Sequence, residues 1–538
     1  MKTFTDILGF SNNEYKPSKK VFKAEPLFEK NSTNGFINAM SNKTSTENGA
    51  LTNISTLDAI VDWFYHGAAL RREMNENRIL NLFVNAFNAN PTKALRILFY
   101  IRDVRGGQGE RRVFRIVLKY LANAETDWLK SNLNLIAEYG RYDDFLELLY
   151  TNLKDEVVDY LGNQLEKDLQ HHLNNEISSI SLLGKWMPSE NSSSKITRKY
   201  AKTLLSTGKF GSARSYRKAL TLLRKDLEIV EDKLRRKDYS SIDYSKLPSY
   251  AMLKYSKNCI HTKSYSTMQG AFLRNDNQRF TEYLNSVEKG ETKINANTLY
   301  PYDIAKDYIN YICYNSWSGT SIPKEDKTAE LQWKALPDYV PEINGIVVND
   351  TSGSMTGLPM CVSMSLAVYI AERNKSEIWR NYVIPFSSNA KWKEVKGKNL
   401  AEKLVSIYTG DCSNTNLQKV FDLILERAKS ANVEDKDMPK QIIIISDMEF
   451  DYCGQNSTNF EAIRNKYLEA GYTLPTLIWW NVDSRSNQTP VTINDKGCIL
   501  LSGSSPVCLQ TALSGENSII EAINKIIDQE RYSCIIYN

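Results

Sequence analysis

The feature that most constrains this chain is the change in its hydrophobic pattern near residue 340. After Pro341, short apolar segments alternate with segments of helical length and period. We predict buried strands at residues 343–350, 382–387, 441–447, 476–482 and 497–503, and helices at 358–374, 417–429, 459–470 and 517–529. Continuously apolar strands that alternate with helices are typical of a mostly parallel sheet covered on both faces. We therefore expect a doubly wound, Rossmann-like α/β domain over residues 339–538.

The chain before this boundary has a different period. Between residues 56 and 240, apolar residues recur at helical spacing in segments broken by Gly, Pro, Asn or Asp, for example at 80–87, 94–101, 113–121 and 145–153. Short successive helices favour a HEAT-like α-helical repeat domain, which we place at residues 56–338 and which the tyrosine-rich segments 240–335 would close. Residues 1–55 are rich in Asn, Ser, Thr and Lys, and we expect an extended N-terminal arm there. The predicted fold class is thus α plus α/β.

The composition excludes several classes of protein. The 538 residues are 42% hydrophobic and 24% charged, which argues against a disordered or fibrous chain. No apolar run approaches the roughly 18–20 residues of a membrane span, and the first residues lack the apolar stretch of a signal peptide. The eight cysteines form no C-x-x-C pair, and four histidines leave little room for a histidine metal site or a Ser-His-Asp triad. We expect a cytoplasmic protein that contacts no membrane.

The net charge of +5 hides an asymmetry along the chain. Residues 341–538 hold 19 basic and 23 acidic residues, whereas residues 195–237 alone hold 14 basic and 4 acidic residues. A concentrated positive field attracts polyanions through phosphate contacts, and aromatic residues among the charges, here Tyr200, Phe210 and Tyr216, suit stacking on single-stranded bases. A long solvated helix is the alternative. Our candidate RNA contacts in this stretch are Lys195, Arg198, Lys199, Lys202, Arg214, Arg217 and Lys218.

The sharpest chemical signal lies where two predicted strands end. Asp350, Ser352 and Ser354 leave the first strand as D-x-S-x-S, Thr415 opens a later helix, and Asp447 ends another strand. Polar ligands bind beyond the carboxyl ends of the strands in such sheets. Three hydroxyls and two carboxylates make an oxygen-only site suited to Mg²⁺ or Mn²⁺. A capped turn without metal is the alternative. An aspartyl phosphatase is disfavoured because Ser352 stands where that chemistry needs a second acid.

This arrangement resembles the metal-ion-dependent adhesion site of von Willebrand factor A domains. The resemblance implies that Ser352, Ser354 and Thr415 touch the metal and that Asp350 and Asp447 contribute directly or through water. It also implies a coordination position for an outside acid, so an acidic protein ligand is a further candidate partner. The sequence departs from the family pattern at Ser413-Asn414, where glycines often precede the threonine.

A second motif, R-D-V-R-G-G-Q-G-E-R-R at residues 102–112, joins two predicted helices. Its three glycines allow a tight turn and close approach of a partner, but no G-K-[S/T] follows, so it is no P-loop. We name Arg102, Arg105, Arg111 and Arg112 as candidate RNA contacts. The alternative is a charged interhelical turn in which Asp103 pairs with an arginine.

The runs IRDVRGGQGERRVF and NPTKALRILFY, together with the metal motif, resemble the Ro ribonucleoproteins, which join a TROVE-type helical domain to a von Willebrand factor A domain. The runs EYGRYDDFLEL, GKWMPS and YRKALTLLRKDLEIVEDKL are closer to a divergent, uncharacterised branch found in phages, bacteria, giant viruses and plants. The resemblance spans roughly residues 56–530. It implies a ring of HEAT-like repeats closed by the A domain, which binds small noncoding or misfolded RNA, including single-stranded 3′ ends, without catalysis.

Both lines of reasoning favour a non-catalytic RNA-binding protein with a divalent-metal site. The competing hypothesis is a metal-dependent protein–protein interaction scaffold that binds no RNA. A nuclease lacks support because no D-x-D or H-x-H cluster stands at the metal motif.

Overall fold

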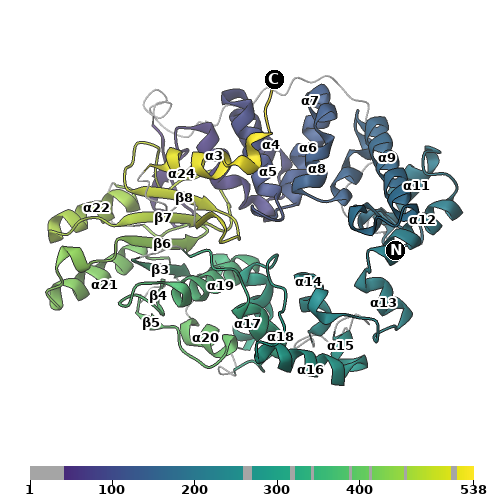
Figure 1. Ribbon diagram of the computed structural model, residues 1–538. Coiled ribbons are helices and arrows are strands. Elements are labelled where there is room, and N and C mark those ends of the chain that lie inside the picture. The colour runs from purple at the N-terminus through teal and green to yellow at the C-terminus, as the bar shows by residue number, and fades with distance from the viewer. Residues whose placement is uncertain are drawn as a thin grey trace, which may run out of the picture. The chain divides into compact units, whose positions relative to one another are not determined.

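The computed structural model describes residues 41–257, 270–315, 322–340, 344–386, 390–410, 415–452, 457–509 and 518–538. Helices occupy the described chain from Ala59 to Lys334, and a six-stranded sheet with its helices follows from Gly345 (Figure 1). We call these parts the helical domain and the sheet domain. The predicted combination of an α-helical and an α/β domain is confirmed. Residues 1–40 of the predicted arm lie outside the described residues.

Several helices of the helical domain begin at a polar side chain that caps them. Asp58 accepts hydrogen bonds from two backbone N–H groups of α3 (Ala59–Gly67), and Asn90 caps α5 (Pro91–Arg102), which begins at its proline. No helix of the described chain combines the length and the apolar character that crossing a membrane requires. The other helices are α4 (Glu76–Ala89), α6 (Arg112–Ala124), α7 (Thr126–Ser131), α8 (Leu133–Tyr139), α9 (Lys154–Leu173), α10 (Leu183–Trp186), α11 (Lys195–Ser206), α12 (Ala213–Asp226), α13 (Val230–Arg236), α14 (Ser249–Ser256), α15 (Ala271–Asn275), α16 (Asn277–Glu288), α17 (Pro301–Asn315) and α18 (Lys327–Lys334).

One predicted helix, at 145–153, differs in the structure. The segment Tyr142–Tyr150 (η2) forms a 3₁₀ helix instead, and α9 begins only at Lys154. The carboxylate of Asp144 accepts a hydrogen bond from the backbone N–H of Arg141 and so caps the segment three residues before the predicted start. The tyrosine-rich segments further on form a separate small core around Tyr244, Phe272 and Phe280.

Within the described residues, the sheet domain contains five parallel strands and one short antiparallel edge strand, in the order β5-β4-β3-β6-β7-β8. All residues of β3 (Gly345–Asp350) and all but the first of β6 (Gln441–Ser446) are buried, as expected of strands covered on both faces. The two strands pair in register from Gly345 with Gln441 to Asn349 with Ile445. The other strands are β4 (Tyr382–Phe386), β5 (Lys393–Glu394), β7 (Thr476–Asn481) and β8 (Cys498–Ser502).

The direction of the crossovers places helices on both faces of this sheet. From β3 the chain passes through α19 (Leu358–Arg373) to β4 on one side, whereas from β6 it passes through α22 (Asn459–Ala470) to β7 on the other. Since crossovers between parallel strands are right-handed, these two helices lie on opposite faces. From β3 the next strand is added on one side of the sheet, and from β6 the next strand is added on the other side. This change in strand order between β3 and β6 creates a crevice at the carboxyl ends of these parallel strands. The remaining helices are α20 (Leu400–Ile407), α21 (Leu417–Ser430), α24 (Ile519–Ile527) and α25 (Glu530–Ser533).

Both ends of the helical domain contact the sheet domain. Near the start, α3 and α5 pack against α24, and α3 also contacts β8. Near the end, α17 packs against α19 and α20. A single hydrophobic core runs through these contacts and includes residues of both domains.

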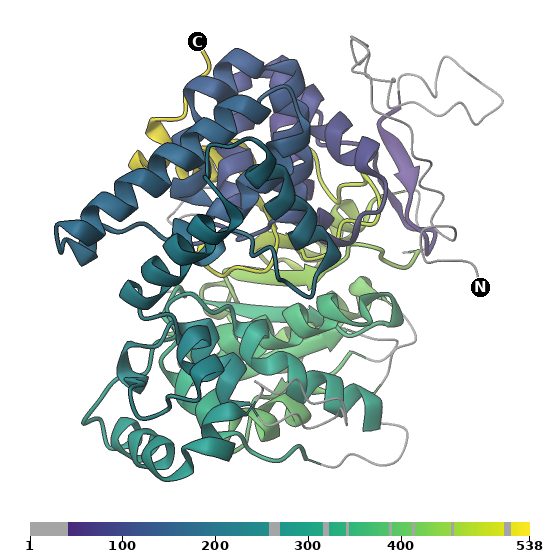
Figure 2. The ribbon, with the colours of Figure 1, turned by 90° about the vertical axis from the view of Figure 1, so that its right-hand side faces the viewer.

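The described part of the predicted arm is more ordered than expected. Residues Lys43–Ser45 (β1) and Leu51–Asn53 (β2) form an antiparallel hairpin (Figure 2). Asn53 and Thr489 exchange two backbone hydrogen bonds, which attach the hairpin to the loop between β7 and β8. Residues 41–53 thus belong structurally to the sheet domain, although they are separated from it in sequence by the whole helical domain.

Candidate metal centre and nucleic-acid interface

The carboxylates of Asp350 and Asp447 lie at the crevice between β3 and β6. Asp350 is the last residue of β3, Asp447 directly follows β6, and both are buried. The Oδ1 atom of Asp350 accepts the backbone N–H of Ser352 (2.8 Å), and its Oδ2 atom accepts the hydroxyl of Ser446 (2.6 Å). These contacts hold Asp350 in one orientation at the end of its strand.

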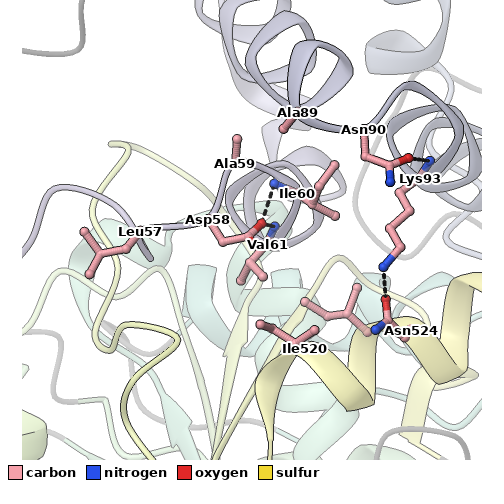
Figure 3. A pocket seen from close by; sticks show the side chains of 11 residues that line it. Leu57, Asp58, Ala59, Ile60, Val61, Ala89, Asn90, Lys93, Ile520 and Asn524 are labelled. Carbon is pink, nitrogen blue, oxygen red and sulfur yellow. Dashed lines mark hydrogen bonds between the residues drawn. The ribbon is translucent and has the colours of Figure 1, made fainter.

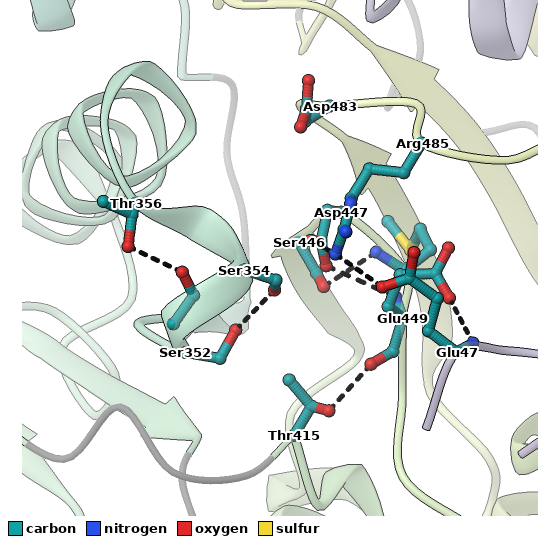
Figure 4. Close-up of polar contacts among 12 residues, drawn as sticks. Glu47, Ser352, Ser354, Thr356, Thr415, Ser446, Asp447, Glu449, Asp483 and Arg485 are labelled. Carbon is teal, nitrogen blue, oxygen red and sulfur yellow. Dashed lines mark hydrogen bonds and ion pairs between the residues drawn. The ribbon is translucent and has the colours of Figure 1, made fainter. Parts of the chain in front are cut away.

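The two serines of the D-x-S-x-S motif, Ser352 and Ser354, lie near Asp447 at the end of β6 (Figure 4). Their hydroxyl oxygens are 3.0 Å apart, and Ser354 lies in the short 3₁₀ turn Gly353–Met355 (η6). Burial raises the pKa of Asp447 above its ordinary value, and a hydrogen bond from Ser354 opposes this rise. The structure therefore brings together Asp350, Ser352, Ser354 and Asp447, four of the five residues named as metal ligands.

The fifth residue, Thr415, has other hydrogen-bond partners. Its hydroxyl lies within hydrogen-bond distance of the backbone oxygen of Glu449 (2.8 Å) and of Oδ1 of Asp451 (3.0 Å). It also accepts a hydrogen bond from Nδ2 of Asn48 in the hairpin (3.0 Å). Residues 411–414, which precede it in the motif, lie outside the described residues. Thr415 is thus attached to the segment after β6 and to the hairpin.

The electrostatics of the crevice favour a cation. Burial raises the pKa of Asp350, and the neighbouring Asp447 carboxylate raises it further. The Oδ2 atom of Asp447 is buried and has no hydrogen-bond partner among the described residues. A buried carboxylate oxygen that accepts no hydrogen bond is costly, even with the guanidinium of Arg485 at 3.8 Å, and a bound cation would satisfy it. With the serine hydroxyls beside it, this oxygen-only set fits Mg²⁺ or Mn²⁺.

The reasoning from sequence missed several charged residues around this crevice. Asp483, which follows β7, pairs with Arg72 of the helical domain, and Arg485 lies 3.8 Å from the unpartnered oxygen of Asp447. Glu449 accepts hydrogen bonds from the backbone of Glu47 and from the hydroxyl of Ser486. The alternation D-x-E-x-D at residues 447–451 is a sequence signal that would have pointed to Glu449.

The glycine motif at 102–112 forms a corner that joins the two domains. Asp103 is fully buried and accepts hydrogen bonds from Nε (2.5 Å) and Nη2 (2.8 Å) of Arg531 near the C-terminus. Gln108 accepts the backbone N–H of Ser505, and a Cβ atom on Gly107 would lie 2.1 Å from the carbonyl oxygen of Tyr100. The interpretation as an interhelical turn with Asp103 paired to an arginine fits this geometry.

The structure corrects the prediction that Arg102 contacts RNA, because this side chain is buried. Its side chain is 1% exposed, and its Nε donates to Oδ2 of Asp144 (2.8 Å), which also pairs with Arg115. Arg105 and Arg111 are exposed but face acids, Arg105 at 3.3 Å from Glu138. Arg112 is half-buried, with one buried guanidinium nitrogen. This corner is therefore mainly structural.

The basic stretch presents its charges on two helices, α11 and α12. Lys195, Lys199 and Lys202 follow one another at spacings of four and three residues, which places them on one face of α11. The opposite face packs through Ala201 and Leu204. Arg214, Arg217 and Lys218 are likewise exposed on α12, and Arg198 is half-buried against the backbone oxygens of residues 192 and 193.

Few acids oppose these cations. Among the described residues, Lys195, Lys202, Arg214 and Lys218 form no ion pair, whereas Arg217 pairs with Glu190. Most of the later cations of the stretch are engaged within the fold: Arg224 donates to backbone oxygens, and Lys233, Arg235 and Arg236 pair with acids. Lys225 of α12 and Lys237 are exposed and form no ion pair among the described residues. The available positive charge of residues 195–237 is thus concentrated on α11 and α12.

The aromatic residues expected to stack on bases take other positions. Phe210 and Tyr216 are buried, and Tyr200 is half-buried, so these rings serve packing. The exposed ring beside the basic helix is Tyr150, which is 51% exposed and lies 4.7 Å from the ammonium group of Lys199. No sequence signal pointed to Tyr150, because it precedes the basic stretch by 45 residues.

A pocket of about 400 Å³ lies between α3, α5 and α24 (Figure 3). Its polar side chains are used within the fold: Asp58 caps α3, Asn90 caps α5, and Lys93 donates to Asn524 (2.9 Å). We assign no function to this pocket.

Comparison with known proteins places the chain in a family. Residues 46–161 and 148–343 match the model described as Domain of unknown function (DUF2828), and together these matches extend over more than half of the chain. The chain belongs to this family. In this DUF2828 protein, residues 344–533 match a second model, Domain of unknown function (DUF7788). The two models meet between α18 and β3, where the helical domain gives way to the sheet domain.

Two further proteins resemble this DUF2828 protein. An uncharacterized protein of Acanthamoeba polyphaga mimivirus is 31% identical over 507 residues, which cover 89% of this chain and 86% of that protein. The crystal structure of the Ro (RSR) protein of Deinococcus radiodurans aligns with a TM-score of 0.36 at 12% identity and covers 88% of this chain and 93% of that chain.

Proposed function

We propose that this protein binds RNA without catalysis through a basic surface on α11 and α12. The observation that carries the proposal is the set of exposed cations without acidic partners on these two helices, Lys195, Lys202, Arg214 and Lys218, together with Lys199 beside an exposed tyrosine. Phosphates supply the negative charge that such a surface lacks, and their counterions gain entropy on release. The resemblance of residues 102–112 and of the metal motif to Ro ribonucleoproteins supports RNA as the polyanion.

Single-stranded RNA is the form that suits this surface. Tyr150 offers a half-exposed ring next to Lys199, and its hydroxyl is fixed by Thr203 of α11 at 3.1 Å. Base stacking on such a ring contributes about 1–3 kcal/mol per base, and a duplex cannot supply an unstacked base. The ligand we propose is a small noncoding or misfolded RNA with a single-stranded 3′ end, held by a TROVE-type ring of HEAT-like repeats.

We further propose that the sheet domain is a von Willebrand factor A domain that binds Mg²⁺ or Mn²⁺. Asp350, Ser352, Ser354 and Asp447 would hold the ion, which supplies positive charge to two buried carboxylates, and Thr415 would contribute after leaving its present hydrogen bonds. The unpartnered oxygen of Asp447 supports this assignment. It also supports the second candidate function, a scaffold in which the cation captures an acidic protein.

RNA binding is tested by titrating the full-length protein with a structured RNA that carries a single-stranded 3′ tail. Affinity is measured between roughly 50 and 200 mM salt, in Mg²⁺ and in EDTA. The test variant replaces Lys195, Lys199 and Lys202 of α11 with glutamine. The matched control replaces three exposed lysines of the sheet domain, Lys391, Lys396 and Lys398, and so removes the same charge.

The α11 variant is expected to weaken binding of all sequences alike and to lower the salt slope by about one for each lysine that contacts a phosphate. The control variant keeps the slope of the wild type. Tyr150→Ala is expected to weaken single-stranded binding by about 1–3 kcal/mol, whereas Tyr150→Phe keeps it. Equal slopes for the α11 variant and the control would overturn the assignment of this surface. Absence of RNA binding at low salt would favour the protein scaffold.

A further inference from the structure

The hairpin of residues 43–53 places its turn at the candidate metal centre. The hydroxyl of Thr46 donates to the backbone oxygen of Phe450 (2.7 Å), and the backbone N–H of Glu47 donates to the Glu449 carboxylate (2.8 Å). Asn48 donates to the backbone oxygen of Glu449 (2.7 Å) and to the hydroxyl of Thr415 (3.0 Å). Three consecutive turn residues are thus fixed to the segment that follows β6.

Arg485 lies between this turn and the buried Asp447 (Figure 4). Its Nη1 atom lies 2.9 Å from a carboxylate oxygen of Glu47 and 3.8 Å from Oδ2 of Asp447. The guanidinium is therefore the positive charge that faces Asp447 in this arrangement. A divalent cation held by Asp350 and Asp447 would repel the guanidinium, because the two like charges would compete for the same carboxylate.

Displacement of Arg485 would leave one carboxylate near the cation without a partner. Two other acids around the crevice keep theirs: Glu449 binds the hairpin backbone and Ser486, and Asp483 binds Arg72. Glu47 has Arg485 as the one ion-pair partner of its carboxylate within the described chain, and its side chain is 56% exposed. Its backbone is fixed by the hairpin, so its carboxylate stays beside the crevice.

We propose that Glu47 supplies an acidic ligand to this cation from within the same chain. The proposal rests on the divalent-cation site proposed above. In this arrangement the carboxylate of Glu47 passes from Arg485 to the cation, and the turn covers the position that an acidic partner protein would use. The conclusion deepens the proposed metal site and argues against an open scaffold.

The experiment measures binding of Mn²⁺ alone to the metal-free full-length protein by isothermal titration calorimetry. Four variants are compared with the wild type: Glu47→Gln, Arg485→Gln, Asp447→Asn, and Glu434→Gln as a control. Glu434 is an exposed acid of the sheet domain whose carboxylate pairs with Lys436. Amide hydrogen exchange of residues 43–53 with and without Mn²⁺ gives a second readout that does not depend on affinity.

We expect Glu47→Gln to weaken Mn²⁺ binding by about tenfold or more and Glu434→Gln to leave it unchanged. Arg485→Gln removes a competing charge and should tighten binding. Mn²⁺ should slow exchange of residues 43–53 in the wild type and not in Glu47→Gln.

The outcomes separate the two proposals. Glu47→Gln could bind Mn²⁺ with the wild-type affinity and show the wild-type hydrogen exchange, while Asp447→Asn abolishes Mn²⁺ binding. That result would overturn the proposal that Glu47 is a ligand and would keep the metal site. No Mn²⁺ binding by the wild type would overturn both.

Discussion

Replacement of Arg531 by methionine tests whether the glycine corner is a structural joint between the domains. The Asp103 carboxylate is fully buried and receives two hydrogen bonds from Arg531, one from the hydroxyl of Tyr532 (3.0 Å) and one from the backbone N–H of Arg105 (2.9 Å). Methionine keeps most of the apolar stem of the arginine and removes its charge. The variant therefore leaves a buried carboxylate that has lost its cation.

The magnitude follows from the burial of the two partners. Removing one member of a buried ion pair costs about 3–5 kcal/mol. We expect about 3 kcal/mol, the lower end, because Arg531 is 30% exposed and Asp103 keeps two other hydrogen bonds. Arg105 provides the control from the same corner, because it and Glu138 are both 56% exposed. Such surface pairs contribute about 0–1 kcal/mol, so Arg105→Met should change little.

The free energy of unfolding is measured from urea denaturation followed by circular dichroism, and protease cleavage of the C-terminal segment reports local opening. A loss of 3 kcal/mol raises the population of the opened form by about a hundredfold. Adding Asp103→Asn to Arg531→Met should recover part of the stability, since it removes the buried charge. Equal stability of Arg531→Met and Arg105→Met, or no recovery in the double variant, would refute the reasoning.

Three further predictions concern single residues. Asp447→Asn should raise the melting temperature in EDTA, because it removes one of two neighbouring buried carboxylates, and should abolish the stabilisation by Mg²⁺. If scanning calorimetry showed that Mg²⁺ stabilises this variant as much as the wild type, the metal site would be contradicted. Burial lowers the pKa of His66 to about 3, so on acidification the unfolded chain binds a proton at this histidine before the folded chain does. The free energy of unfolding should therefore fall as the pH drops below about 6.5, by about 1.4 kcal/mol at pH 5.5, and urea titrations of His66→Gln should lack this pH dependence. Gly107→Ala should cost about 3 kcal/mol of stability, because its Cβ would meet the carbonyl of Tyr100. The control Gly208→Ala, which has open space around it and a φ of +74°, should cost about 1 kcal/mol, so similar melting temperatures of the two variants would contradict the close approach at Gly107.

Local patterns were sufficient for the long strands and most of the helices of the sheet domain, but they did not predict β5, α20 or α25. The predicted segments 441–447 and 459–470 correspond to β6 and α22 within one residue at each end. The period of the apolar residues can be read from neighbours in the chain, and the strand β6 and the helix α22 form where that period predicts them. The meeting of Asp350 with Asp447 was also within reach, because chain order and right-handed crossovers bring the carboxyl ends of the first and third predicted parallel strands together.

Contacts across long sequence separations were beyond this reasoning. Arg102 and Arg105 stand three residues apart in one basic motif, yet Arg102 is buried by Asp144 and Arg105 is exposed. Charge patterning registers both as arginines of a turn and contains no information about the acid 42 residues away that buries one of them. The same holds for the aromatic residues of the basic stretch, which pack inward.

The sequence by itself determined the two kinds of domain and the oxygen-rich ends of β3 and β6, because each depends on short-range periodicity and residue chemistry. Only the tertiary structure decided which charges are available. It joined Asp103 to Arg531 across 428 residues and placed Asn48 on Thr415 across 367 residues. It also left four cations of α11 and α12, Lys195, Lys202, Arg214 and Lys218, without an ion pair among the described residues. The physical reason is that a charge is free or engaged according to its neighbours in space, and these are set by packing between segments that no local pattern connects.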